Sequence, residues 1–345
     1  MIPEEKKDSV TRALREAFGV AEFEDIQRFT KGNPTSLVFR IVVKGSQYIL
    51  KIILRADDPT CNYTCMKAAA EAGLAPRVWY TNIEDKISIT DFVEAVPLPV
   101  TDALVRMPAT LRRLHALTPF PRRADHINTS CMFLINKGAA LDAFIQKFQA
   151  ANILPKGYSE ELFAWHAQVA AVYPYHDPDM VSSHNDLFKP DNVLFDGHRV
   201  WLVDWEAAFL NDRYADLAVV ANLVVANDAE ERIYLEEYFG RPPDPYQLAR
   251  FFLMRQVTHM FYAMAYLWQG SAGKTIDWSA TVPEFKALNR RNWAGDIDLK
   301  DIDTKIVYGR VHWEQLVQNT RTARFQDALR IVSDRDVIAR TGDHA

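Results

Sequence analysis

The chain has little cysteine, little net charge and no long apolar run. Three cysteines are too few, and uneven in number, for a disulfide framework, which favours a reducing compartment. A formal net charge of -5 gives no reason to expect nucleic-acid binding or adsorption to an anionic membrane. The longest apolar run, residues 217–226, is too short to cross a bilayer, and the first residues lack the apolar centre of a signal peptide. We therefore expect a cytoplasmic protein with no membrane or nucleic-acid partner.

What the chain does contain is an ordinary globular composition, with 48% apolar and 25% charged residues over 345 positions. This length suffices for two lobes. β-branched and aromatic residues predict strands at residues 25–29, 36–44, 46–54, 77–82 and 86–91. Helical periodicity predicts helices at residues 9–18, 61–72, 102–117, 140–152, 159–173, 215–226, 229–239, 246–269 and 307–338, with residues 278–303 irregular.

The most informative stretch begins at His184 and reads HNDLFKPDNVLF, followed closely by VWLVDWE. Two apolar strands separated by a turn at residues 196–198 predict a hairpin. Such a hairpin would hold Asp186, Asn192 and Asp204 close together at its edge. Phosphoryl transfer needs a carboxylate that orients the attacking hydroxyl and oxygen ligands for magnesium, so the stretch predicts phosphotransfer chemistry.

This stretch resembles the catalytic segment of the aminoglycoside phosphotransferase and choline kinase superfamily, which reads His-x-Asp-x-x-x-x-Asn and continues to a strand ending in Asp. The run DWEAAFLNDRYADLA, from Asp204 onward, is most similar to the choline kinase branch. The resemblance covers roughly residues 25–270. It implies an α+β, bilobal protein-kinase-like fold with a small antiparallel-sheet N-lobe and a larger, mainly helical C-lobe. The expected divisions are residues 1–93, a proline-rich hinge at residues 94–99, and residues 100–345.

The resemblance also implies a role for each polar residue of the catalytic segment. Asp186 is expected to orient the proton of a substrate hydroxyl, and Lys189 either contacts the transferring phosphate or only covers the loop. Asn192 and Asp204 are the expected Mg²⁺ ligands. The expected structural supports of the loop are His184 and Asp216.

ATP is the expected cofactor together with Mg²⁺. Lys51 interrupts an otherwise apolar strand at the place where kinases have their phosphate-anchoring lysine. Residues 30–36 occupy the place of the nucleotide loop but contain one glycine, so taken alone they also suit an ordinary turn. Backbone groups at the hinge are expected to meet the adenine edge. The expected nucleotide-binding residues are Lys51, Asn33, Ser36, Asp91 and Val93.

Two departures from the family pattern bear on activity. Asp186 and Asn192 are six residues apart instead of five, so we expect a small bulge with the roles kept, or Asp191 as the ligand instead. The helix over residues 61–72 has no acid near its start to pair with Lys51. Either another acid substitutes, or the protein has weakened activity or is a pseudokinase. The nearby candidates are Asp57, Asp58 and Glu71.

The acceptor is expected to be a small molecule with a hydroxyl group. Choline-type kinases surround a quaternary ammonium with aromatic faces, and aromatic residues follow the catalytic segment here. The expected acceptor-site residues are Trp205, Tyr262 and Trp268, with Glu206 as a counter-charge. Aromatic residues at helical spacing also suit a buried core. Choline, ethanolamine or a related amino alcohol is the expected acceptor; the alternatives are an aminoglycoside, thiamine or sugar kinase, or a pseudokinase binding module.

Overall fold

The computed structural model describes residues 2–29, 36–56, 58–122, 146–174, 180–188, 190–272 and 274–342, with side chains up to residue 334. The chain forms two compact units. Unit 1 comprises Met1–Leu98 and Asn192–Ala208, and unit 2 comprises Pro99–Asp191 and Phe209–Ala345. Two parts of unit 1 were expected elsewhere: residues 94–98 were expected in the hinge, and residues 192–208 in the C-lobe.

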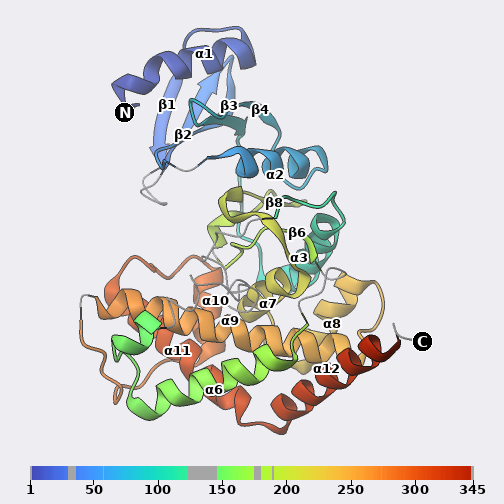
Figure 1. Cartoon of the computed structure of the whole chain (residues 1–345). Helices are drawn as coiled ribbons and strands as arrows, with labels where there is room; N and C mark the ends of the chain where they lie inside the picture. Colours follow the sequence, from blue (N-terminus) through green and yellow to red (C-terminus); the bar gives the residue numbers. More distant parts are fainter. Residues whose placement is uncertain are drawn as a thin grey trace. The chain divides into compact units, whose positions relative to one another are not determined.

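A five-stranded antiparallel sheet forms the centre of unit 1 (Figure 1). Its strands are β1 (Asp25–Phe29), β2 (Ser36–Val43), β3 (Ser46–Ile53), β4 (Val78–Asn82) and β5 (Ile87–Asp91), in the order β1-β2-β3-β5-β4. Every second residue of β2 is buried, as period-two burial of one sheet face requires. A short 3₁₀ turn, η1 (Glu4–Lys6), leads into α1 (Lys7–Phe18), which covers that face with Val10, Ala13 and Leu14. The core of unit 1 therefore lies between α1 and the sheet.

The remaining elements of unit 1 are α2 (Thr60–Glu71), the strands β7 (Val193–Phe195) and β8 (Val200–Leu202), and the 3₁₀ turn η4 (Trp205–Ala207). A further 3₁₀ turn, η3 (Pro190–Asn192), precedes β7. The predicted hairpin is confirmed, since β7 and β8 pair antiparallel. Asp196 holds its turn by accepting the backbone N–H groups of His198 and Arg199, both at 2.8 Å.

Unit 2 is mainly helical and is built around one long helix, α9 (Pro245–Ser271) (Figure 1). A capping box starts α9: the Asp244 side chain accepts the backbone N–H of Gln247, and the Gln247 side chain accepts that of Asp244. The helices α7, α11 and α12 all pack against α9. The described elements of unit 2 are α3 (Val100–His115), α6 (Lys156–Val172), β6 (Met180–Ser183), β9 (Phe209–Asp212), α7 (Arg213–Val224), α8 (Asp228–Phe239), α9, α10 (Phe285–Trp293), α11 (Ile302–Thr320) and α12 (Ala323–Gly342).

Residues 278–303 are less irregular than the sequence indicates. The helix α10 lies within this range and buries Phe285, Leu288 and Trp293. Its apolar residues are too few for a periodicity that stands out, so packing against α7 and α11 determines the helix. The strands β6 and β9, which pair antiparallel, were also not predicted. Of the expected helix over residues 140–152, residues 146–152 are described; residues 146–150 are helical, and residues 151–152 form a turn.

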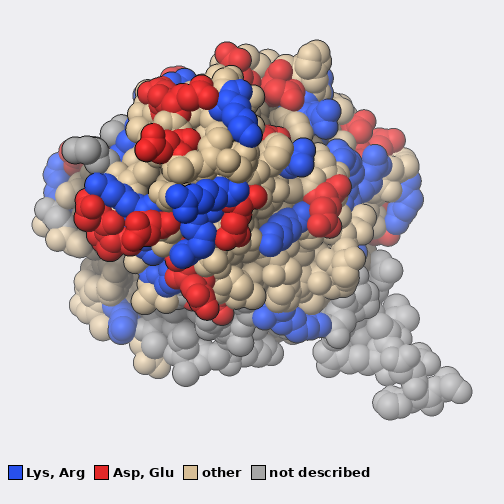
Figure 2. Space-filling model, turned by 90° about the horizontal axis from the view of Figure 1, so that it is seen from above, with Lys and Arg blue, Asp and Glu red and all other residues tan. Residues whose placement is uncertain are grey.

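Charge on the surface is mixed in sign. On the face shown in Figure 2, Lys and Arg side chains are interspersed with Asp and Glu side chains. Some of these charges are paired at the surface, as in the Arg12–Asp85 ion pair at 2.5 Å. In the part of the chain that the structure describes, no helix combines the length and the apolar content needed to cross a membrane.

Candidate active site

Lys51 lies in the middle of β3, opposite Val38 of β2 and Ser88 of β5. Its neighbours Leu50 and Ile52 belong to the core under α1, so strand alternation directs the lysine to the other face of the sheet. There the lysine Nζ donates a hydrogen bond to Asp204 Oδ1 at 2.8 Å. The structure thus brings together a predicted phosphate anchor and a predicted metal ligand.

A second carboxylate shares the Lys51 ammonium. Glu206 Oε1 lies 2.8 Å from Lys51 Nζ, and Glu206 Oε2 lies 3.0 Å from an Arg55 guanidinium nitrogen. Burial lowers the pKa of Lys51, but the charges of Asp204 and Glu206 outweigh it, so the pKa is raised overall. The ammonium is therefore firmly charged, as a phosphate anchor has to be.

The acid that pairs with Lys51 differs from each of the three candidates considered from the sequence. The Asp58 carboxylate accepts the backbone N–H and the hydroxyl of Thr60 at the start of α2, and Glu71 is exposed at the end of α2. Asp57 lies outside the described residues. Glu206, expected as a counter-charge for the acceptor, forms an ion pair with Lys51. The contact of Glu206 with Arg55 was not anticipated from the sequence.

Asn192 and Asp204 lie at the open end of the β7–β8 hairpin. The pairing of Val193 with Leu202 brings the two ends together, and the N–H of Val203 donates to the carbonyl of Asn192 at 3.0 Å. Asp204 has a left-handed backbone, with φ 64° and ψ 66°, a conformation that Asp tolerates better than most residues. The predicted proximity of Asn192 and Asp204 therefore follows from the hairpin register.

This pair suits Mg²⁺ in its donor chemistry, because hard cations prefer carboxylate and amide oxygens. Within the described residues, no three His, Cys, Asp or Glu side chains converge into a metal cluster. Proteins often hold Mg²⁺ through one or two side chains, with phosphate oxygens and water completing the shell. The donors at the hairpin end fit that sparse arrangement.

In unit 2, Asp186 follows β6 in a loop whose backbone is held by Asp216. The Asp216 carboxylate accepts the backbone N–H groups of His184 and Asn185, both at 2.8 Å. His115 Nε2 lies 3.3 Å from the same carboxylate. Burial raises the pKa of Asp216, but the hydrogen bond and charge of His115, with those from His184, lower it overall. An ionised carboxylate thus fixes the loop just before Asp186.

Two further contacts fix this loop. Asn185 has a left-handed backbone with φ 67°, and its side-chain oxygen accepts from Asn211 Nδ2 at 2.6 Å. The backbone N–H of Asp186 points at His184 Nδ1, 3.4 Å away. Lys189, the neighbouring predicted catalytic residue, lies outside the described residues.

Aromatic rings pack against Phe188, the residue two positions after Asp186. The Phe188 ring lies 5.0 Å from Tyr262 and 6.2 Å from Tyr266, centroid to centroid, and Tyr266 lies 4.9 Å from Tyr308. Burial raises the pKa of both Tyr262 and Tyr266, and the negative charge of Asp186 contributes to both shifts. Asp186 is therefore close enough to both tyrosines to act on them. Phe188 and Tyr308 were not anticipated from the sequence.

The structure also gives the surroundings of the other two predicted acceptor-site aromatics, Trp205 and Trp268. Trp205, in unit 1, is 2% exposed and donates its indole N–H to the carbonyl of Leu202 at 3.2 Å. Its ring is part of the core, which argues against contact with a substrate. Trp268, in unit 2, is half-buried with its ring 6.5 Å from that of Phe148.

The remaining nucleotide-binding predictions concern the ends of strands. Ser36 begins β2 opposite Ile53, whereas Asn33 lies outside the described residues. Asp91 ends β5, and its carboxylate accepts the indole N–H of Trp79 at 2.6 Å. Among the described residues, the backbone N–H of Val93 has no hydrogen-bond acceptor.

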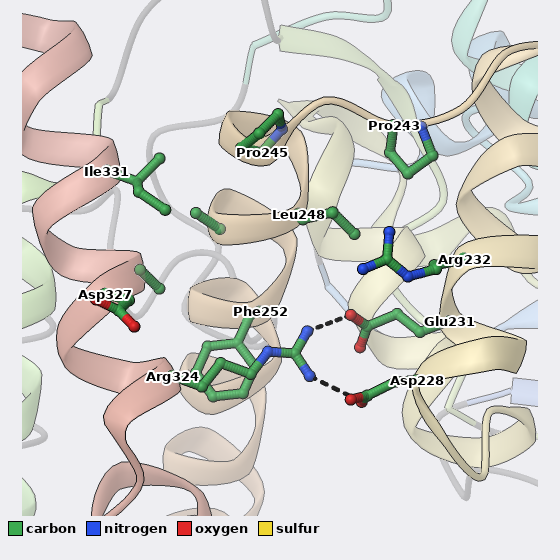
Figure 3. A pocket seen from close by; sticks show the side chains of 12 residues that line it. Asp228, Glu231, Arg232, Pro243, Pro245, Leu248, Phe252, Arg324, Asp327 and Ile331 are labelled. Carbon is green, nitrogen blue, oxygen red and sulfur yellow. Dashed lines mark hydrogen bonds and ion pairs between the residues drawn. The ribbon is translucent and has the colours of Figure 1, made fainter.

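A pocket of about 430 Å³ in unit 2 lies between α8, α9 and α12 (Figure 3). Arg324 stacks over the Phe252 ring at 4.3 Å and pairs with Asp228 and Glu231 (Figure 3). The single positive charge of Arg324 is therefore shared by two carboxylates, and Glu231 also pairs with Arg255 at 2.8 Å. None of the residues predicted from the sequence to form the active site lines the pocket.

Solved structures with this arrangement of sheet and helices are kinases and phosphotransferases, which defines the fold as kinase-like. A choline/ethanolamine kinase family protein from Mesorhizobium loti aligns with a TM-score of 0.62 and 19% identity, covering 95% of this chain and 99% of that one. The choline kinase LicA from Streptococcus pneumoniae aligns with a TM-score of 0.53 and 15% identity, covering 85% and 98%. A spectinomycin phosphotransferase, solved with ADP and spectinomycin, aligns with a TM-score of 0.51 and 14% identity, covering 88% and 98%.

The sequence itself matches a family profile over most of its length. The profile of the phosphotransferase enzyme family matches residues 25–251, so the chain belongs to that family. Comparison with curated protein sequences gives no match. The predicted superfamily and the predicted α+β kinase-like fold are confirmed.

Proposed function

We propose that the protein transfers the γ-phosphate of Mg-ATP to the hydroxyl group of a small amino alcohol such as choline or ethanolamine. The observation that carries the proposal is the Lys51–Asp204 contact of 2.8 Å at the open end of the β7–β8 hairpin. In this contact the charged ammonium of Lys51 meets the carboxylate of Asp204. Asp204 and Asn192 are also the two side chains suited to bind a hard cation. Such a group of charges suits the phosphates of a nucleotide.

In this proposal unit 1 binds the nucleotide. Lys51 anchors the inner phosphates, and Asn192 with Asp204 holds Mg²⁺, which neutralises charge on the phosphates. The N–H of Val93, at the end of the sheet, is a donor suited to the adenine edge. The roles of Asn33 and Ser36 remain those expected from the sequence.

Unit 2 supplies the group that acts on the acceptor. Asp186 accepts or orients the proton of the substrate hydroxyl as the oxygen attacks. The two N–H groups held by Asp216 support this role, because a loop fixed before the reaction requires no reordering during it. Positioning and electrostatics contribute most of the acceleration in phosphoryl transfer.

The aromatic rings beside Asp186 favour a cationic acceptor. Phe188, two residues after Asp186, packs against Tyr262 and Tyr266, and aromatic faces attract ammonium groups. The negative charge of Asp186 adds to that preference. Two of the structural neighbours are described as choline or ethanolamine kinases, which agrees with this acceptor class.

The alternatives are a kinase for an aminoglycoside, thiamine or a sugar, and a pseudokinase. The spectinomycin phosphotransferase among the neighbours keeps an aminoglycoside in consideration. The pseudokinase was motivated by the missing helix acid beside Lys51 and by the longer catalytic loop. The first motive is weaker, because Glu206 lies 2.8 Å from Lys51.

Coupled ADP release with Mg-ATP, measured across choline, ethanolamine, aminoglycosides, thiamine and sugars, tests the proposal. We expect turnover on an amino alcohol, and its loss by at least about a thousandfold in Asp186→Asn and Asp204→Asn with the fold retained. Glu236→Gln, at an exposed position of α8, is the control and should keep full activity. Nucleotide binding without turnover on any acceptor would instead support the pseudokinase.

A further inference from the structure

Glu206 is placed to control the position of Lys51. Its side chain is 13% exposed, and its two oxygens contact Lys51 and Arg55 at 2.8 Å and 3.0 Å. A carboxylate held at both oxygens by cations has little freedom to turn away. Glu206 is therefore a fixed anchor on the strand lysine.

Asp204 is the other carboxylate on Lys51, and the proposed function gives it a second task. Its Oδ1 accepts from Lys51, yet the same side chain is a proposed Mg²⁺ ligand. If Asp204 held Mg²⁺, its charge would be shared between the metal and Lys51, and a second carboxylate would be needed to keep the ammonium in place. Glu206 already occupies that position.

The helix α2 does not supply this carboxylate. The first turn of α2 contains no acid, and Tyr63 is the α2 residue whose pKa Glu206 affects. Burial raises the pKa of Tyr63, and the charge of Glu206 raises it further, so the phenol stays neutral. Among the described residues, the Tyr63 hydroxyl is buried and has no hydrogen-bond partner. The residue that α2 places near Glu206 is thus a neutral tyrosine instead of an acid.

We infer that Glu206 is the positioning residue for Lys51, a carboxylate contributed by η4 in place of the helix glutamate of protein kinases. Arg55 holds Glu206 in turn. The inference rests on the proposed function, since it concerns nucleotide binding at the same site. It makes Glu206 part of the nucleotide site and removes it from the acceptor site.

The test measures the affinity of the purified full-length protein for a fluorescent ADP analogue, in Mg²⁺ and again in EDTA. We expect Glu206→Gln to weaken nucleotide binding about tenfold or more in both conditions. The lysine that loses its anchor binds phosphate directly, so this loss does not depend on the metal. Glu206→Asp, which keeps the charge, should recover part of the loss. Glu71→Gln, an exposed acid at the end of α2, should bind as the parent does.

A double-mutant cycle with Lys51→Met shows whether Glu206 acts through the lysine. In the Lys51→Met background, Glu206→Gln should add less than about a twofold loss, because the partner is already gone. A loss that appears only with Mg²⁺ would make Glu206 a metal ligand. A loss that is undiminished in the Lys51→Met background would show that Glu206 does not act through the lysine. Either result overturns the inference. Thermal unfolding of each variant checks that the fold is kept.

The outcomes also separate this inference from the proposed function. If the parent protein binds no nucleotide in Mg²⁺, the proposed function fails, and the inference fails with it. If the parent binds nucleotide and Glu206→Gln binds equally well, the inference alone is overturned. Glu206→Asp gives the same comparison should Glu206→Gln fail to fold.

Discussion

At the scale of single residues, the fixed loop before Asp186 depends on one buried carboxylate. Asp216 is 1% exposed and accepts two backbone N–H groups, one with each oxygen. Asparagine has a single acceptor oxygen, so in Asp216→Asn one of these N–H groups faces an NH₂ group. The substitution therefore leaves a buried donor without a partner and also removes the charge beside His115.

We predict that Asp216→Asn lowers kcat about tenfold to a hundredfold and destabilises the fold by about 2 kcal/mol. The kcat is measured by ADP release on the acceptor that the panel identifies, and the stability by urea unfolding. Glu236→Gln again serves as the control. A variant with unchanged kcat would show that the backbone of the loop does not need this carboxylate.

The residues of the site differ in how far the sequence could predict them. Asn192 and Asp204 were predictable as neighbours, because the hairpin that joins them is local and has clear turn and strand signals. The partner of Lys51 was not, because Glu206 lies 155 positions away and its approach depends on the packing of η4. The burial of Trp205 could not be predicted either, since a tryptophan next to an expected metal ligand fits both a core and a substrate site.

At the scale of elements, the packing of α9 against α11 depends on two glycines. A Cβ added at Gly309 would lie 2.9 Å from the backbone nitrogen of Leu267, and one added at Gly270 would lie 2.5 Å from Ile306 Cγ1. The first contact is with backbone, which cannot move aside as a side chain can. Close approach of these two helices thus excludes even a methyl group at Gly309.

We predict that Gly309→Ala destabilises the protein by about 1–3 kcal/mol, although alanine favours a helix by about 1 kcal/mol. Gly157→Ala in α6 is the matched control, because a Cβ there meets nothing within 4 Å. That variant should be neutral or slightly stabilised. Urea unfolding of both variants measures the difference, and equal midpoints would contradict the predicted clash.

Elements were predictable where their own sequence suffices. The strands β2 and β3 are rich in β-branched and aromatic residues, and α9 has a long apolar pattern, so these elements were expected close to their observed bounds. The helix α10 and the strands β6 and β9 are short, and their neighbours in space determine them. Short elements of this kind give too few periods for a sequence pattern to stand out.

At the scale of the whole molecule, the catalytic segment is divided between the two units. Asp186 belongs to unit 2, whereas Asn192 and Asp204 belong to unit 1. The boundary runs between Asp191 and Asn192, inside η3. The loop from Asp186 to Asn192, which is one residue longer than the family pattern, therefore leads from one unit to the other.

The stability of unit 2 should depend on pH through a buried histidine pair. His259 and His312 contact each other through their Nδ1 atoms at 3.0 Å, which requires one ring to donate and the other to accept. Burial, the nearby His312 and the charge of Arg255 lower the pKa of His259, and burial lowers the pKa of His312 to about 3. Both rings are therefore neutral in the folded protein at neutral pH.

The direction of the pH effect follows from these lowered pKa values. In the unfolded chain both histidines titrate near their ordinary pKa of about 6.5. Below that pH the unfolded state binds protons that the folded state does not, so stability is fully present above about pH 6.5 and is lost as the pH falls. The loss amounts to about 1.4 kcal/mol per pH unit for each histidine that stays neutral, and for His312 it continues toward pH 3.

We predict that the urea midpoint falls steadily between pH 7 and pH 5, and that His312→Phe makes this dependence shallower by removing one of the two titrating groups. The larger ring lowers stability at every pH through packing, so the slope against pH, rather than the midpoint itself, is the quantity to compare. His198→Gln, at an exposed turn, should keep the parent's slope. Equal slopes for the parent and His312→Phe would mean that His312 is protonated in the folded state, because a group charged in both states contributes no pH dependence.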